Sequence, residues 1–231
     1  MRRRTGVPAS IAALLGVIAL AVLSSGPATP ATTPGTSAGQ AEALPSPRLT
    51  GGLELDAALA ARRSVRSFTP RPLTPAEIGQ LLWSAQGVTD AAGHRTAPSA
   101  GATYPLELDV VTADGLARYL PDGHALVRRG SADLRPALRQ AALDQEAVGA
   151  APLVIVIVGV EDRTAARYGE RAARYVALEA GHAAQNVLLE AVSLGLGAVP
   201  IGSFDDGAVR RVLGLADGEA PLYLVPVGHP G

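Results

Sequence analysis

The segment Ala172–Leu194 constrains this chain most, because its apolar side chains recur at spacings that cover nearly the whole circumference of a helix. A helix that is apolar all round cannot face water, so it has to be buried in a core or at a subunit interface. Gly195 and Gly197 follow, and we expect the helix to end there because glycine accepts a positive φ. Ala198–Ile201 then predicts a short buried strand. Residues 202–203 predict a turn at which a backbone amide can approach a flat ligand.

The N-terminus has the pattern of an export signal. Arg2–Arg4 precede the apolar run Ile11–Leu23. This run has the length of the apolar part of a signal peptide and is short of the roughly 20 residues that a spanning helix needs. Extending it back to Val7 makes a membrane anchor the alternative. We therefore assign residues 1–23 to a signal peptide or N-terminal anchor, and we expect an exported or membrane-anchored, extracytoplasmic protein.

Residues 24–48 are rich in Pro, Ala, Thr, Ser and Gly and show no apolar periodicity. Such a composition cannot bury a core, so we predict a disordered linker. The remaining residues, 49–231, have the length of one domain with a sizeable core.

Composition excludes several classes of site. The chain has no Cys, which rules out disulfides and thiolate metal ligands. Its formal net charge of −1 gives no reason to expect nucleic-acid binding. Its four His residues lack the spacing of zinc ligands, so we expect no metal site.

Capping signals and apolar patterns divide the domain into elements. Leu53–Ala61 predicts a short helix, and Thr74 opens the next one as N-cap, with Pro75 at N1 and Glu77 able to close a capping box. Strands and helices mix without strict β-α-β alternation, which predicts an α+β fold with helices on a central sheet. The other expected elements are strands at Leu106–Thr112, Pro152–Val160 and Leu222–Gly228, a turn at 121–123, a helix from Ser131 to Val148, and a helix capped by Asp205 or Asp206 that ends at Gly214.

Two loops are candidate ligand contacts. The segment Arg62–Phe68 contains three Arg and two Ser in seven residues. Guanidinium groups pair with phosphate oxygens, so this segment predicts an anion site, with a solvated basic loop as the alternative. The segment Ala97–Pro105 consists mostly of small residues. It allows a backbone to approach a ligand closely, and it also reads as a plain turn.

Three motifs together resemble the nitroreductase-like flavoproteins. Arg62–Phe68 is similar to the N-terminal signature of that family, and Pro98–Pro105 is similar to its second flavin loop. Gly195–Phe204 resembles the third motif, with Val225–His229 closing the sheet. Each motif alone is weak, but their order and spacing together are specific, and they cover residues 53–229.

Within the family, Ala97–Ala102 and Glu179–Asn186 resemble the SagB-type dehydrogenases, whose azoline-oxidising members act in peptide natural-product pathways. The resemblance implies a nitroreductase-like helix–sheet sandwich with a long buried central helix. It also implies an FMN-dependent oxidoreductase that is a homodimer with the flavin at its interface. Hydride would pass through flavin N5 in a ping-pong reaction. NADH or NADPH as electron donor stays open, as does the small-molecule substrate (nitro, quinone or azoline-type).

The resemblance also implies which residues contact the flavin. Phosphate and ribityl contacts would come from Arg62, Arg63, Ser64 and Arg66. Three residues would lie beside the ring or the ribityl chain: Ser99, Ala100 and Gly101.

The third motif would contact the ring itself. Pro200 and Ile201 would pack on the ring face. The N–H groups of Gly202 and Ser203 would face N5 and O4. Backbone dipoles there can stabilise the charge of reduced flavin without a titrating group.

Two departures from the family pattern matter. Many nitroreductases have an acidic residue at the position of Gly202. Many also place Lys and Arg phosphate ligands beyond the last strand, whereas this chain ends at Gly231. The phosphate is then expected to depend more heavily on the arginines of the first motif.

No catalytic side chain is assigned. His182 is read as catalytic or as a hydrogen-bonded core or interface residue, with the second favoured. Three tyrosines are read as proton donors or as packing residues: Tyr104, Tyr168 and Tyr175. The alternative to an enzyme is a non-catalytic exported protein that binds flavin or another planar ligand.

Overall fold

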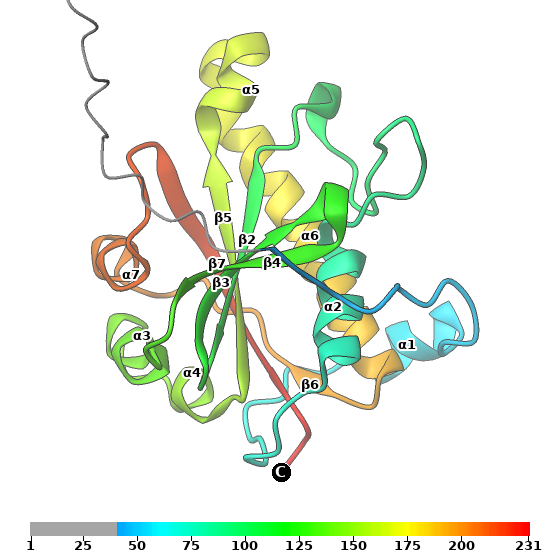
Figure 1. Cartoon of the computed structure of the whole chain (residues 1–231). Helices are drawn as coiled ribbons and strands as arrows, with labels where there is room; N and C mark the ends of the chain where they lie inside the picture. The colour runs from blue at the N-terminus through cyan, green and yellow to red at the C-terminus, as the bar shows by residue number, and fades with distance from the viewer. Residues whose placement is uncertain (1–40) are drawn as a thin grey trace, which may run out of the picture. The chain divides into compact units, whose positions relative to one another are not determined.

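The computed structural model describes residues 41–231, and the predicted signal peptide or anchor lies outside this range. The described chain forms a seven-stranded antiparallel sheet with the order β1-β4-β3-β2-β5-β7-β6, flanked by helices (Figure 1). The predicted α+β sandwich is confirmed. The strands are β1 (Ala41–Ala43), β2 (Leu106–Thr112), β3 (Gly115–Leu120), β4 (Ala125–Gly130), β5 (Leu153–Val160), β6 (Gly197–Ala198) and β7 (Glu219–Gly228). The helices are α1 (Leu55–Ala61), α2 (Pro75–Gln86), α3 (Arg135–Ala141), α4 (Glu146–Ala150), α5 (Glu161–Tyr168), α6 (Ala172–Ser193) and α7 (Asp206–Leu213).

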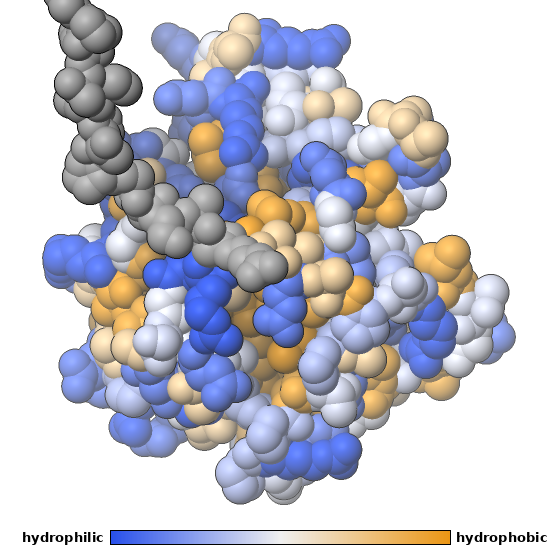
Figure 2. All heavy atoms as spheres, viewed as in Figure 1, coloured by the Kyte–Doolittle hydropathy of each residue, from blue (hydrophilic) through white to orange (hydrophobic). Residues whose placement is uncertain are grey.

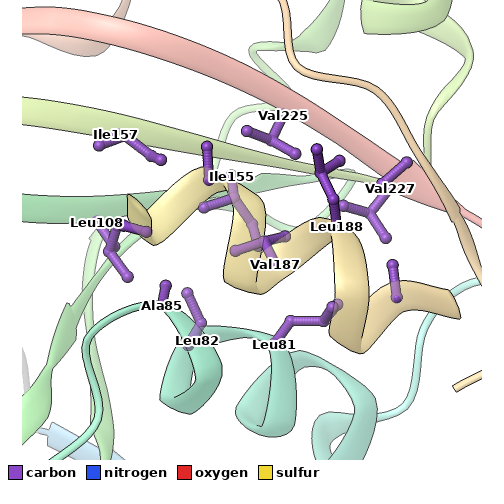
Figure 3. Packing of buried hydrophobic residues seen from close by; sticks show 14 of the residues in the cluster. Leu81, Leu82, Ala85, Leu108, Ile155, Ile157, Val187, Leu188, Val225 and Val227 are labelled. Carbon is purple, nitrogen blue, oxygen red and sulfur yellow. The ribbon is translucent and has the colours of Figure 1, made fainter. Parts of the chain in front are cut away.

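Two apolar clusters sandwich the sheet. On one face Ile155 and Ile157 of β5 pack with α2 and α6, as Figure 3 shows. On the other face Val154 and Val156 pack with α3, α4 and α7. Successive side chains of a strand point to opposite faces, so β5 is buried on both. This confirms the strand expected from its uninterrupted β-branched run.

Helix α6 has the predicted extent, and one chain buries only one of its faces, so burial of the other face at a subunit interface stays a prediction. It runs from Ala172 to Ser193, and Gly195 follows its cap with φ 71°. One face packs on the sheet and on α2. The other face leaves Leu178 51% exposed, and His182 is exposed too. The helix is therefore not buried all round within one chain. Neither α6 nor any other helix of residues 41–231 combines the length and apolarity needed to cross a membrane.

The capping signals correctly locate two helices. In α2 the Thr74 side chain accepts from the Glu77 N–H, and the Glu77 side chain accepts from the Thr74 N–H, so the capping box is formed. In α7 the Asp205 side chain accepts from the N–H of Ala208, and Gly214 takes the left-handed conformation at the C-terminal end.

One prediction for the middle of the chain is wrong, and one helix there was missed. The helix expected from Ser131 to Val148 is two short helices, because Leu143 and Asp144 both have φ 57° and interrupt it between α3 and α4. Helix α5 was not predicted. The turn at residues 121–123 is confirmed, and it joins β3 to β4 as a hairpin.

The end of the predicted linker is also corrected. Ala41–Ala43 pairs with β4, the N–H of Leu44 donates to His124 O (2.9 Å), and the N–H of Arg48 donates to the Gln80 side chain (2.7 Å). The folded domain therefore includes residues 41–48. A three-residue edge strand held by backbone bonds needs no apolar periodicity, which is why composition did not reveal it. Residues 24–40 of the predicted linker lie outside the described range.

Candidate functional site

Strand β6 joins two of the three predicted motifs. Ser64 forms a parallel bridge with Ala198, and the N–H of Val65 donates to Ala198 O (3.0 Å). A Cβ atom at Gly197 would lie 2.5 Å from the Val65 side chain, so only glycine allows this approach. The arginine segment, which we define as residues 62–66, therefore runs beside the strand that leads into the turn at residues 202–203.

The three arginines of this segment have different roles. Arg63 donates to the carbonyl oxygens of Ala60 and Arg62, both at 2.8 Å, and so caps the C-terminal end of α1. Within residues 41–231, Arg62 and Arg66 make no ion pair, and their guanidinium groups donate no hydrogen bond. Arg62 is half-buried and Arg66 is exposed. Of the three arginines predicted at the phosphate, Arg62 and Arg66 are therefore available to an anion, whereas Arg63 already donates to two carbonyl oxygens.

The turn at residues 202–203 presents two unused amides. Ile201 exchanges two backbone hydrogen bonds with Leu224 (2.8 and 3.0 Å), and Ser203 O accepts from the Gln145 side chain (2.8 Å). Gly202 and Ser203 are exposed, and no described residue accepts a hydrogen bond from either N–H group. The turn is thus anchored at both ends and leaves two adjacent donors for a ligand. Gln145 was not predicted, because it lies where a continuous helix was expected.

The side chains around this turn differ from the expectation in one respect. Ile201 is 5% exposed and packs in the same apolar cluster as Val199 and Leu224, so its side chain cannot lie on the face of a ring. Pro200 is half-buried and remains available. A Cβ atom at Gly202 would meet only the Tyr223 ring, at 3.5 Å, so the space beside the turn is open.

The second motif is a tight turn. The segment 100–102 forms one turn of 3-10 helix, in which Gly101 and Ala102 have φ 60° and 53°. Ser99 Oγ accepts the N–H of Tyr104 (2.9 Å). Arg167 donates to Gly101 O (3.2 Å), and no described residue accepts from the N–H groups of Ala100 or Gly101. This turn too presents two free amides.

One chain does not bring all three motifs together. Thr103 bonds Thr164 of α5 (2.9 Å), and Ser99 faces Glu179 in the N-terminal half of α6. The arginine segment lies beside β6, which follows the C-terminal end of α6. Glu179 and Ser193 are about 21 Å apart along a helix axis at 1.5 Å per residue. Figure 1 shows β6 and the loop before β2 at opposite ends of α6.

The residues considered as catalytic show mainly packing contacts. Tyr168 and Tyr175 meet edge to face with ring centroids 5.1 Å apart, and the Arg95 guanidinium lies 4.4 Å above the ring of Tyr104. His182 is exposed on the face of α6 that points away from the sheet. These contacts favour the packing interpretation of the tyrosines and assign no proton donor. Among residues 41–231, no group of three or more acidic, His or Cys side chains is placed to hold a metal ion.

Two cavities of the described chain lie away from the predicted flavin residues. One, of about 350 Å³, lies between α1, α2 and α6, and its lining includes Trp83 and Asn186. The other, of about 950 Å³, lies between the Pro70–Pro75 segment and β2, β3 and β4. Figure 2 shows apolar surface gathered in the middle of one face of the molecule. Neither cavity is lined by a residue of the three motifs, as expected if one chain forms only part of their site.

Comparison with known proteins identifies the family. Residues 59–229 match the nitroreductase family. A Methanocaldococcus jannaschii protein provisionally named a nitroreductase is 45% identical over 183 residues, covering 77% of this chain and 91% of that protein. A provisionally named nitroreductase from Ralstonia eutropha has a crystal structure that matches with a TM-score of 0.76 and 32% identity, over 83% of this chain and 90% of that one. The NADPH:FMN oxidoreductase of Vibrio harveyi, solved with NAD+, matches with a TM-score of 0.58 and 26% identity, over 76% of this chain and 68% of that one. The fold, the order of the motifs and these matches agree, and the chain belongs to the nitroreductase family.

Proposed function

We propose that the protein is an FMN-dependent oxidoreductase that transfers a hydride between the flavin and a small organic molecule. One observation supports this most strongly. Strand β6 joins two segments whose polar groups have no partner among residues 41–231. One segment carries the guanidinium groups of Arg62 and Arg66, and the other carries the N–H groups of Gly202 and Ser203. FMN offers a phosphate at one end and hydrogen-bond acceptors on its pyrimidine ring at the other.

These residues suit the two ends of the cofactor. Bound FMN supplies an isoalloxazine ring that accepts and returns a hydride at N5. Arg62 and Arg66 would neutralise the phosphate, for which guanidinium groups are well shaped. The amides of Gly202 and Ser203 would donate to the pyrimidine side of the ring. Fixed backbone dipoles do this at any pH and with no reorganisation. Pro200 would pack on one face of the ring.

We propose that the flavin site is completed by a second copy of the chain. The turn at residues 99–102 belongs to the family's flavin site by resemblance, yet within one chain it lies at the far end of α6. The surface that a partner would cover is apolar: Leu55 and Leu59 of α1 are 62% and 50% exposed, and Leu178 of α6 is 51% exposed. An obligate interface typically buries about 2,000 Å² or more. Light scattering that shows a flavin-loaded monomer at micromolar concentration would contradict this.

The substrate class and electron donor are also proposals. NADH or NADPH as donor is supported by the Vibrio harveyi relative, which is an NADPH:FMN oxidoreductase solved in complex with NAD+. Membership of the SagB-type branch, and with it an azoline-type substrate, is supported only by the segments Ala97–Ala102 and Glu179–Asn186. Nitroaromatics and quinones are the other substrate classes.

The test uses the purified protein. We expect a yellow protein with the absorption spectrum of FMN, which NADH or NADPH bleaches under anaerobic conditions. Adding a nitroaromatic or a quinone, which accepts hydride, should then restore the oxidised spectrum. An azoline peptide, which gives up hydride when it is oxidised, should instead bleach the oxidised flavin without any nucleotide. The molecule that reacts names the substrate class, and a bound flavin that reacts with no nucleotide, acceptor or azoline would favour the non-catalytic alternative.

We also propose export through residues 1–23, on the strength of their basic and apolar pattern. Fractionation of cells that express the full chain tests this. Recovery of the intact, unprocessed protein only from the cytoplasmic fraction would contradict it.

A further inference from the structure

A buried carboxyl group lies directly behind the turn at residues 99–102. Glu179, on α6, is only 2% exposed, and its Oε1 atom has no hydrogen-bond partner among the described residues. Gln86, the last residue of α2, is fully buried, and its Nε2 atom also has no partner there. Buried polar groups are nearly always paired, so two unpaired ones at one place need an explanation.

The Ser99 hydroxyl group faces this carboxyl group. The Ser99 hydroxyl and the Gln86 amide lie close enough to Glu179 to oppose the rise in its pKa, but among the described residues no contact to Oε1 is short enough to be a hydrogen bond. The carboxyl group is therefore an acceptor that the serine can reach with a small movement.

The geometry of Ser99 leaves its hydroxyl hydrogen available to Glu179. Ser99 Oγ already accepts the N–H of Tyr104 at 2.9 Å. A hydroxyl group has one hydrogen to donate, and Glu179 is the acceptor that faces it. With its hydrogen and one of its two lone pairs used inside the protein, the serine side chain has at most one lone pair left for a ligand. What the turn offers outward is the pair of N–H groups of Ala100 and Gly101.

Arg95 orients the Gln86 side chain. Its guanidinium group donates to Gln86 Oε1 (3.0 Å) and lies over the Tyr104 ring. Because the amide oxygen is held by Arg95, the amide nitrogen is left to face Glu179. Burial raises the pKa of Glu179, while Ser99, Arg95 and Gln86 oppose that rise without cancelling it.

We propose that Glu179 is a positioning residue that accepts a hydrogen bond from the Ser99 hydroxyl group. This bond fixes the turn that presents the N–H groups of Ala100 and Gly101 to the flavin. The inference rests on the proposed function for the identity of the ligand. The hold of Glu179 on the turn does not depend on that ligand, and it can be measured in the flavin-free protein.

The first test is hydrogen exchange of the Tyr104 amide in the flavin-free protein. Glu179→Met fills the same volume without a strong acceptor, and Glu179→Gln keeps one. We expect exchange to be faster by roughly tenfold in Glu179→Met, the size expected for the loss of one buried hydrogen bond. Glu179→Gln should stay within about threefold of the parent protein, because its carbonyl oxygen can still accept. The control is Glu190→Gln, which alters another largely buried α6 carboxylate, paired with Arg48 near the other end of the helix. Unchanged exchange in Glu179→Met would overturn the proposal.

The second test is a double-mutant cycle on FMN affinity with Glu179→Met and Ser99→Ala. If Glu179 acts through Ser99, the double variant should bind FMN no more weakly than the weaker single variant, whereas independent roles would give losses that multiply. Multiplying losses would overturn the proposal. If the parent protein binds no flavin, the proposed function fails, and the exchange measurement still decides the role of Glu179.

Discussion

Two pairs of arginines in this molecule have opposite environments. Arg118 and Arg129 both bond Asp109, a fully buried carboxylate, at 2.7 and 2.8 Å. Arg62 and Arg66 have no acidic partner within residues 41–231. Arginine therefore has two roles in this molecule. The paired arginines link neighbouring strands, and Arg62 and Arg66 are left to bind an anion.

The paired cluster also extends to a fourth strand, β7. Arg118 of β3 bonds Asp109 of β2 and Glu219 of β7, and Arg129 additionally donates to Gly214 O (3.1 Å). Burial alone would lower the pKa of Arg118, but the hydrogen bonds to Asp109 and Glu219 raise it. The charge on Arg118 is thus held within the fold. Its removal should affect stability, whereas removing Arg66 should affect ligand binding.

The largest effect is expected from Asp109→Ala. This change leaves Arg129 with no acidic partner among the described residues and Arg118 with Glu219 alone, and breaking a buried ion pair in this way costs about 3–5 kcal/mol. Urea unfolding of the flavin-free protein measures the loss. Asp109→Asn, which keeps an oxygen acceptor, should lose less. If Asp109→Ala lowered the free energy of unfolding by less than about 1 kcal/mol, the cluster would contribute little to stability.

The next largest effect is expected from Arg66→Ala, on ligand binding alone. One charge-assisted hydrogen bond contributes about 1.5–3 kcal/mol, so FMN affinity should fall by roughly 10- to 100-fold. Arg62→Ala should behave alike. Riboflavin lacks the phosphate, so its affinity should be nearly unchanged, and so should the free energy of unfolding without flavin. Fluorescence titration with both flavins decides the matter, because equal losses for FMN and riboflavin would place Arg66 elsewhere than at the phosphate.

A pH-dependent effect is expected from Glu219→Gln. Burial would raise the pKa of Glu219, but the hydrogen bonds from Arg118 and from the Ala216 N–H leave it below its usual value of 4.5. A lowered pKa means that the charged form is stabilised by folding. The contribution is therefore complete above pH 4.5 and is lost as the pH falls through the lowered folded value. The parent protein should be the more stable by about 1 kcal/mol near pH 7, and the difference should shrink below about pH 4. A constant difference across this range would contradict the role of the charge.

The smallest effect is expected from Arg63→Ala. Arg63 caps α1 at its exposed C-terminal end, where a favourable cation contributes about 0.3–1 kcal/mol. FMN affinity should change by less than about threefold, because the guanidinium group is engaged with carbonyl oxygens. A loss of FMN affinity as large as that of Arg66→Ala would mean that Arg63 leaves its cap to bind the phosphate.

Features encoded by neighbouring residues could be predicted from the sequence. The Thr74–Glu77 capping box, the Asp205 cap and the extent of α6 depend on residues a few positions apart, and all three are present. The fold class followed from the order of these elements and from the three motifs. The proximity of the first and third motifs at β6 could also be expected, because the family resemblance placed both against one ligand.

Features that depend on distant residues could not be predicted. The Asp109 cluster joins four strands, and no local pattern shows that a charged residue inside a strand will meet two arginines. The proximity of Glu179 to Ser99 could not be predicted either, because α6 and the loop before β2 are far apart in the sequence. The interruption at Leu143 and Asp144 was missed because leucine favours helices and rarely takes the left-handed conformation that it has here.

The pairing of β1 with β4 determines where this protein can be shortened. Ala41–Ala43 is hydrogen-bonded along residues 125–127 and so covers the outer edge of the sheet. A chain that starts at Leu49 would leave that edge bare, with a row of N–H and C=O groups able to pair with the same edge of another molecule. Bare edges of this kind lead to aggregation. A proteolytic fragment that keeps this edge paired therefore has to begin at or before Ala41. A fragment that begins later would be more prone to aggregation.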